Sequence, residues 1–321
     1  MDKVVYSQSV CLMNEILEMY YLSGMTQQKI AARLNLSKPT VSRLLKSAEK
    51  NNMLSVSIRE PYLDCLKLQK EFSAIYPGIK IYVVPVLKDY EKNHKMTVAI
   101  EGARHVQRML QDNQTLGVAW GGTIHYMIQT LNPCQKKNIS VVTLHGEISR
   151  CGDEYDVDEL VKRAAMSLGG KQYIFGQSGY FPSEEALRDY YEDVNYKKLQ
   201  RIFEKIDLSV IGAGCWGRVM TSPLTPPITD YISPEEFKEI QEKDVAADIM
   251  LHYVNRQGEE IDSEIRKRTL SIDLDIYRKI PCKIALLSGV EKVKALQAVI
   301  NGGYADVIYC DYELAKKLYY M

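Results

Sequence analysis

The segment 26–46, TQQKIAARLNLSKPTVSRLLK, constrains this chain more than any other, because it predicts two short helices that cross at a tight turn. Apolar residues fall at spacings that bury one face of each helix: Ile30, Leu34, Leu36, Val41 and Leu44. Asn35 stands at the turn, where a left-handed backbone is needed. Ser37 can cap the second helix, and Pro39 lies in its first turn, where a missing N–H costs nothing. The segment predicts a helix-turn-helix.

Positive charge is concentrated around this motif. The 321-residue chain has a formal net charge of zero. Between Met25 and Lys50, however, Glu49 is the one acid, and six residues are basic: Lys29, Arg33, Lys38, Arg43, Lys46 and Lys50. A confined basic patch on a neutral protein is the expected footprint of phosphate contacts, although a solvated helix face is the alternative. We therefore expect double-stranded DNA as a partner.

The candidate DNA-binding residues lie at the outward positions of the motif, because the N-terminal part of the second helix enters the major groove. Arg43 is the best candidate for a bidentate guanine contact, since its planar fork matches two acceptors on that base. Gln27, Gln28, Lys29 and Lys46 are expected to contact phosphates. The predicted set is Gln27, Gln28, Ser37, Lys38, Pro39, Thr40, Ser42, Arg43 and Lys46.

Cysteine and histidine usage excludes several classes of site. The seven cysteines are scattered and form no CxxC pair, which favours reduced thiols over a disulfide framework or a zinc site. The five histidines form no H-x-x-x-H pattern, so we expect no metal site. Neither a signal peptide nor an apolar run of membrane-spanning length is present in this sequence. We expect a cytoplasmic protein without a membrane partner.

The chain divides into three predicted regions. Residues 1–60 form the helix-turn-helix domain, in which residues 10–21 supply a first helix and Gly24 ends it. Residues 54–58 alternate as in a strand, which suggests a winged variant. Residues 61–77 form a connecting helix, either a dimer contact or a linker packed on the next domain. Residues 78–321 form an effector-binding and oligomerisation domain.

This last region predicts an α/β fold with a doubly wound, mostly parallel sheet. Helical stretches such as 96–111 and 157–168 lie between short apolar runs, several of which lack alternation, as expected of strands buried on both faces. The predicted strands lie within residues 79–86, 115–120, 139–146, 171–178, 207–214, 247–254, 283–289 and 305–310.

Three of these strands end in glycine-rich turns, where ligands of such sheets bind. The turns are Trp120–Thr123, Gly212–Gly217 and Ser288–Gly289, the last followed by Lys292. Each alone reads equally as a tight βα turn, and none is a P-loop or a dinucleotide fingerprint. Together, with helix N-termini and a lysine, they favour a small anionic ligand.

Polar residues near these turns are further candidates for the same crevice. His145, followed by Gly146, could add a polar wall. Asp156, Asp158 and Asp248 could accept hydrogen bonds from sugar hydroxyls, although each reads equally as a helix cap or a surface group.

Three stretches together resemble the SorC (DeoR-like) family of bacterial sugar-responsive repressors. They are QQKIAARLNLSKPTVSRLLKSAEKNNMLSVSI, LGVAWGGTI, and KIALLSGVEKVKALQAVINGGYADVIYCDYELAKKL, in the family's order and spacing over essentially the whole chain. The resemblance implies a domain similar to ribose-5-phosphate isomerase and glucosamine-6-phosphate deaminase. It also implies a phosphorylated sugar as effector and a homotetramer, a dimer of dimers.

The resemblance also assigns residues to the effector site. The family's phosphate turn falls on Gly121, Gly122 and Thr123, its C-terminal glycine and lysine fall on Gly289 and Lys292, and its acidic residue falls on Asp248. Ile124 stands where many members have a second hydroxyl residue. Glu147 replaces a usual glycine, and its charge would repel a second phosphate. The resemblance with these departures implies one phosphate rather than two.

We therefore expect a DNA-binding regulator of a carbohydrate-utilisation operon, with no catalytic residues and no cofactor. One alternative is a sugar-phosphate isomerase or deaminase that carries a DNA-binding tail. Another is a constitutive DNA-binding scaffold with an unused crevice. For the regulator, we expect the effector to act through the connecting helix, which would set the spacing of reader pairs.

Overall fold

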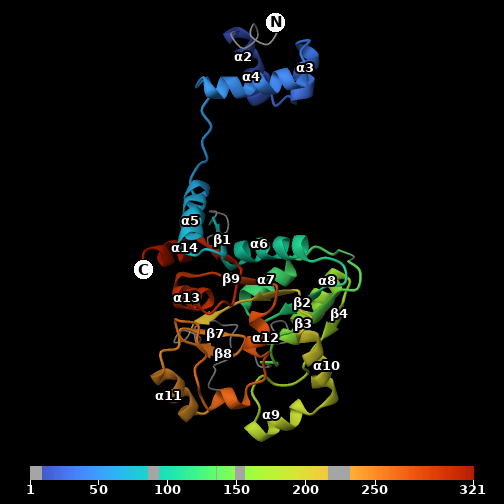
Figure 1. Ribbon diagram of the computed structural model, residues 1–321, viewed down its shortest axis with the longest axis vertical. Coiled ribbons are helices and arrows are strands. Elements are labelled where there is room, and N and C mark those ends of the chain that lie inside the picture. Colours follow the sequence, from blue (N-terminus) through green and yellow to red (C-terminus); the bar gives the residue numbers. More distant parts are fainter. Residues whose placement is uncertain (1–8, 86–93, 135, 149–155, 216–231) are drawn as a thin grey trace. The chain divides into compact units, whose positions relative to one another are not determined.

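The computed structural model describes residues 9–85, 94–134, 136–148, 156–215 and 232–321 (Figure 1). The chain forms two compact units, residues 1–59 and residues 60–321. Each unit has its own hydrophobic core.

The first unit is a bundle of three helical segments. Its elements are α2 (Val10–Leu17), continued by a π-helical turn at Glu18–Leu22, then α3 (Gln27–Arg33) and α4 (Lys38–Lys50). Ile16, Ile30, Val41 and Leu44 are each at most 1% exposed and fill its core. The apolar spacing of the sequence therefore predicted this core correctly.

Local polar contacts fix the turn between α3 and α4. Thr26 and Ser37 cap the two helices, and the Ser37 hydroxyl accepts a hydrogen bond from the Thr40 backbone N–H at 3.2 Å. Asn35 has a φ of +51°, the left-handed conformation expected at this turn. Pro39 lies in the first turn of α4. These contacts confirm the predicted helix-turn-helix.

The predicted wing is wrong. The described backbone of residues 51–61 contains no strand, and the side chains of Val56 and Ile58 are 71% and 50% exposed. Alternating residues form a stable strand only where a neighbouring strand satisfies their backbone groups, and no described strand pairs with this segment.

The second unit is built on a seven-stranded sheet whose pairings are all parallel. The strand order is β1-β10-β9-β5-β2-β3-β4. The strands are β1 (Lys80–Val84), β2 (Thr115–Val118), β3 (Ser140–Thr143), β4 (Lys171–Tyr173), β5 (Leu208–Ile211), β9 (Cys282–Leu287) and β10 (Val307–Asp311).

Helices cover both faces of this sheet, as in a doubly wound fold (Figure 1). One core includes side chains of α6 (His94–Met109), α7 (Gly122–Gln129) and α8 (Val157–Leu168). The opposite core includes α5 (Tyr62–Ile75), α10 (Val194–Phe203), α13 (Val293–Asn301) and α14 (Tyr312–Tyr319). Successive residues of one strand, such as Leu286 and Leu287, enter opposite cores. The remaining helices are α9 (Glu184–Tyr191), α11 (Pro234–Glu242) and α12 (Leu274–Arg278), with short 3₁₀ turns at Ile265–Arg268 and Val290–Lys292.

Residues 247–254 correct a second expectation. They form a tight hairpin of β7 (Ala247–Ile249) and β8 (His252–Val254) rather than one strand, because Met250 and Leu251 both adopt positive φ. With β6 (Gly214–Cys215) they make a three-stranded antiparallel sheet. Apolar residues at the turn hid it from the sequence pattern.

Helix α5 is part of the second unit. It packs on β1 and α14, and its Phe72 is 1% exposed and contacts the Tyr319 ring. The Gln69 side-chain carbonyl also accepts a hydrogen bond from the Val83 backbone N–H at 2.9 Å. Residues 62–75 are therefore a packed helix of the second unit.

Candidate nucleic-acid interface and ligand crevice

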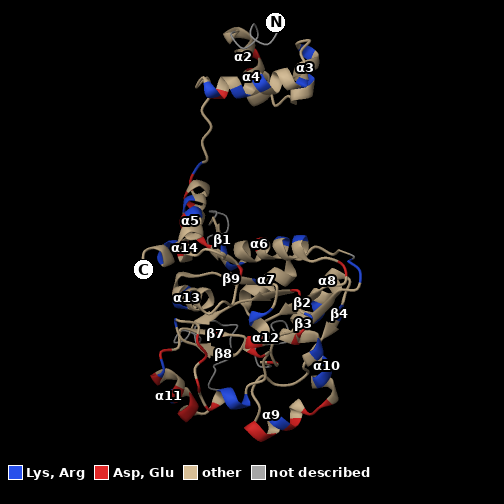
Figure 2. Ribbon diagram, viewed as in Figure 1, with Lys and Arg blue, Asp and Glu red and all other residues tan. Residues whose placement is uncertain are grey.

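The outward face of α4 carries the predicted DNA-binding side chains. Lys38, Pro39, Arg43 and Lys46 are exposed, while Thr40 and Ser42 are half-buried. Figure 2 shows the basic residues along α3 and α4. Among the described residues, neither Arg43 nor Lys46 forms an ion pair. Their positive charge therefore remains available to phosphates or base edges.

Two residues of the predicted interface are partly committed within the unit. The hydroxyls of Ser37 and Thr40 lie 2.8 Å apart and hydrogen-bond to each other, while Ser37 also caps α4. Gln28 is exposed and Gln27 is half-buried, at the start of α3. The hydroxyls of Ser37 and Thr40 are thus less available to DNA than the side chains of Lys38, Arg43 and Lys46.

The three glycine-rich turns of the second unit follow three neighbouring strands, because the sheet order runs β9-β5-β2. A methyl group on Gly212 would lie 3.8 Å from the Trp120 carbonyl oxygen and 4.0 Å from the Leu286 carbonyl oxygen. The turns therefore meet at the carboxyl edge of the sheet. Trp216 and Gly217 of the middle turn lie outside the described residues.

The turn between β2 and α7 leaves hydrogen-bond donors without partners. Gly121 has a φ of +133° and precedes α7, and no side chain caps this helix. The hydroxyl of Thr123, a residue 3% exposed, has no hydrogen-bond partner within the described structure. A buried hydroxyl without a partner is costly, and helix N-terminal N–H groups favour an anion. Gly121, Gly122 and Thr123 thus form a plausible anion cradle.

The turn after β9 is held by a residue that the sequence analysis missed. Asp311, only 1% exposed, accepts hydrogen bonds from the Gly289 N–H at 2.7 Å and the Leu314 N–H at 2.9 Å. The Gly289 amide is therefore committed to Asp311 rather than free for a ligand. An aspartate directly before α14 is a common N-cap signal that could have identified it.

Lys292 and Asp248 influence each other electrostatically across this edge. Burial lowers the pKa of Lys292, and the charge of Lys95 lowers it further, whereas Asp248 acts in the opposite direction. Burial raises the pKa of Asp248 to about 6. One Asp248 oxygen accepts a hydrogen bond from the Leu251 N–H at 2.9 Å and so stabilises the hairpin turn. Lys292 forms no hydrogen bond or ion pair with the residues described.

His145 does not form a polar wall of the crevice, which corrects the prediction. It is fully buried, its Nε2 accepts a hydrogen bond from the Trp120 N–H at 3.0 Å, and its Nδ1 lies 2.8 Å from the Gly146 carbonyl oxygen. Burial lowers the pKa of His145 to about 4, so the ring is neutral with its proton on Nδ1. The ring joins the end of β3 to the end of β2 and supports the anion cradle from behind.

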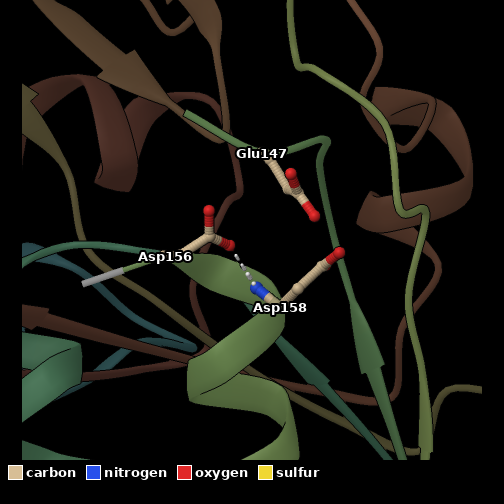
Figure 3. Close-up of side chains that lie close together, drawn as sticks. All are labelled: Glu147, Asp156 and Asp158. Carbon is tan, nitrogen blue, oxygen red and sulfur yellow. Dashed lines mark hydrogen bonds between the residues drawn. The ribbon is translucent and has the colours of Figure 1, made fainter. Parts of the chain in front are cut away.

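Asp156 belongs to a cluster of three carboxylates (Figure 3). It caps α8 by accepting a hydrogen bond from the Asp158 N–H at 2.8 Å. Asp158 accepts a hydrogen bond from the Gly176 N–H at 3.2 Å, and Glu147 lies close to both aspartates. Burial, then a side-chain hydrogen bond with Glu147 and the Glu147 charge, raise the pKa of Asp158 to about 8. The sequence hid this cluster because Glu147 comes from a different segment.

A comparison with protein families matches residues 60–319 to the putative sugar-binding domain family and residues 13–51 to sigma-70 region 4. The first match covers most of the chain. This chain belongs to the putative sugar-binding domain family. No helix among the described residues of this family member has the length and apolar character needed to cross a membrane.

Similar proteins are named as transcriptional regulators. The deoxyribonucleoside regulator of Bacillus subtilis is 27% identical over 95% of this chain and 96% of its own length. The sorbitol operon regulator of Klebsiella pneumoniae is 23% identical over 97% of this chain and 98% of its own. The crystal structure of that full-length regulator, SorC, matches 97% of this chain and 99% of its own with a TM-score of 0.75 at 21% identity. The fold predicted from the sequence is thereby confirmed.

Proposed function

We propose that this sugar-binding-domain protein is a transcriptional regulator that binds operator DNA through α4 and responds to a phosphorylated sugar. The observation that carries the proposal is the exposed basic face of a helix-turn-helix in one chain with a domain of the sugar-binding family. The regulatory roles named for similar proteins, sorbitol operon control among them, support a role in carbohydrate utilisation.

In the DNA complex, Arg43 pairs with a guanine edge, while Gln28, Lys38 and Lys46 contact phosphates. Arg43 suits this role because it is exposed and its guanidinium has no acidic partner among the described residues. Ser37 and Thr40, which bond to each other, then serve mainly to hold the start of α4 in place.

In the effector complex, the phosphate lies against Gly121, Gly122 and Thr123, with Lys292 supplying a positive charge. The Thr123 hydroxyl without a partner supports this assignment. Asp248 and Asp156 accept hydrogen bonds from the sugar hydroxyls. Gly289 positions the Lys292 turn through its bond to Asp311. The carboxylates around Glu147 repel a second phosphate, so the effector carries one.

Control of DNA binding requires the effector to prefer one arrangement of the assembly, typically by about 1–3 kcal/mol of coupling. Helix α5 is the proposed relay, because it packs in the effector domain and begins just after the boundary at Arg59. We infer a cytoplasmic homotetramer as the working assembly.

The test is fluorescence anisotropy on DNA upstream of the protein's own gene, with and without a panel of pentose and hexose phosphates. A specific DNA complex whose affinity one compound changes supports the proposal. Specific DNA binding that no compound alters would favour the scaffold. Turnover of any compound in the panel would favour the isomerase or deaminase.

A further inference from the structure

The three carboxylates of Glu147, Asp156 and Asp158 converge although they come from two segments. Glu147 follows the end of β3, and the two aspartates stand at the start of α8. One carboxylate oxygen from each residue lies within 4.8 Å of the other two. Figure 3 shows the side chains of Glu147 and Asp158 directed toward each other. Three acids this close repel one another unless one of them is protonated or a positive species lies between them.

A second observation concerns the inner oxygen of Asp158. Asp158 is 9% exposed, and its Oδ1 is screened from solvent and has no hydrogen-bond partner within the described structure. Its Oδ2 accepts from the Gly176 N–H, so this carboxylate is half satisfied. No described lysine or arginine forms an ion pair with Glu147 or Asp158. A buried acceptor left in this state indicates a missing partner.

The chemistry of the three groups selects the kind of partner. Carboxylate oxygens are ligands of hard divalent cations, and one oxygen from each acid lies within 4.8 Å of the other two. Ca²⁺ accepts flexible coordination at about 2.3–2.6 Å, whereas Mg²⁺ demands near-ideal octahedral geometry and keeps most of its water, so three acids from two segments favour Ca²⁺.

We propose that Glu147, Asp156 and Asp158 bind one calcium ion at the start of α8. Water completes the coordination sphere on the side of Glu147 and Asp156, which are only half-buried. The ion ties the segment after β3 to α8 and so stabilises the second unit. This site shares Asp156 with the proposed sugar contacts but does not use the anion cradle, so calcium binding is tested without any sugar present.

The test uses the full chain after EDTA treatment and dialysis, with CaCl₂ added alone. We expect one ion per chain by isothermal titration calorimetry, and a rise in Tm of about 5 °C at saturation. Mg²⁺ at the same concentration should give a smaller rise, and NaCl at equal ionic strength should give none.

Two variants assign the site, and one serves as a matched control. Asp158→Asn and Glu147→Gln keep the side-chain shapes and should each abolish or strongly weaken calcium binding. Asp193 caps α10 through the Asn195 N–H, as Asp156 caps α8, but lies outside the cluster. Asp193→Asn should therefore leave calcium binding intact. Absence of calcium binding in the parent protein overturns the proposal. So does full binding in both Asp158→Asn and Glu147→Gln.

Discussion

The face of α4 and the carboxyl edge of the sheet in the second unit use polar groups in opposite ways. On α4, Arg43 and Lys46 are exposed and have no acidic partners among the described residues. At the strand ends, His145 and Asp311 are buried and hydrogen-bonded to the backbone, whereas Thr123 and Lys292 form no hydrogen bond with the described residues. On the exposed helix the polar side chains therefore remain available to a ligand, whereas at the buried strand ends several of them serve the fold instead.

The largest expected effect is the dependence of stability on pH that the buried His145 produces. Its folded pKa of about 4 lies below the ordinary value of 6.5, so the unfolded chain binds the proton more strongly. The stability contributed by the neutral ring is complete above pH 6.5 and is lost as the pH falls toward 4. We expect a loss of up to about 3 kcal/mol in the free energy of unfolding across this range.

Urea denaturation between pH 4 and pH 7 measures this dependence. His145→Gln removes the titrating group and should flatten the slope, whereas His94→Gln, at a half-buried position in α6, should preserve it. Equal slopes for the parent and His145→Gln would show that His145 is not the group responsible.

The next effect tests whether Lys292 is functional rather than structural. Lys292→Met keeps the length and removes the charge, and should weaken sugar-phosphate binding by about 10- to 100-fold, because hydrogen bonds to charged groups contribute about 1.5–3 kcal/mol. Isothermal titration calorimetry measures the change. Lys294→Met, at an exposed position in the first turn of α13, is the control. Equal affinities of the two variants would remove Lys292 from the phosphate site.

The comparison also explains how far the sequence could predict this molecule. The core positions of Ile30, Val41 and Leu44 could be predicted because helical spacing is a local property of the sequence. The buried strands could be predicted for the same reason. The carboxylate cluster and the role of His145 depend on contacts between segments far apart in sequence, which spacing does not encode. The hairpin at Met250 and Leu251 was missed because its turn carries apolar residues rather than glycine or asparagine.

The α4 face makes its own prediction, of intermediate size. Arg43→Lys retains the charge but loses the planar fork, so it should reduce discrimination against a mutated operator by about 1–2 kcal/mol while largely preserving non-specific DNA binding. Anisotropy with matched operator and scrambled DNA measures both quantities. Lys46→Gln should instead weaken binding to both DNAs equally and lower the salt dependence. If Arg43→Lys, like Lys46→Gln, weakened binding to operator and scrambled DNA equally, Arg43 would contact a phosphate rather than a base.

The smallest expected effect concerns the segment that the sequence assigned to a wing. Val56→Ser and Ile58→Ser replace exposed side chains of a segment without strand pairing, so each should change the free energy of unfolding by no more than about 0.5 kcal/mol. Thermal unfolding of the full chain measures this, with Val41→Ala in the core of the same unit as the contrast, at about 1–3 kcal/mol. A Tm loss for Ile58→Ser as large as that for Val41→Ala would mean that this segment packs in solution. That result would support the predicted strand at residues 54–58. A negligible loss together with unchanged DNA affinity would leave α3 and α4 as the elements of the first unit that bind DNA.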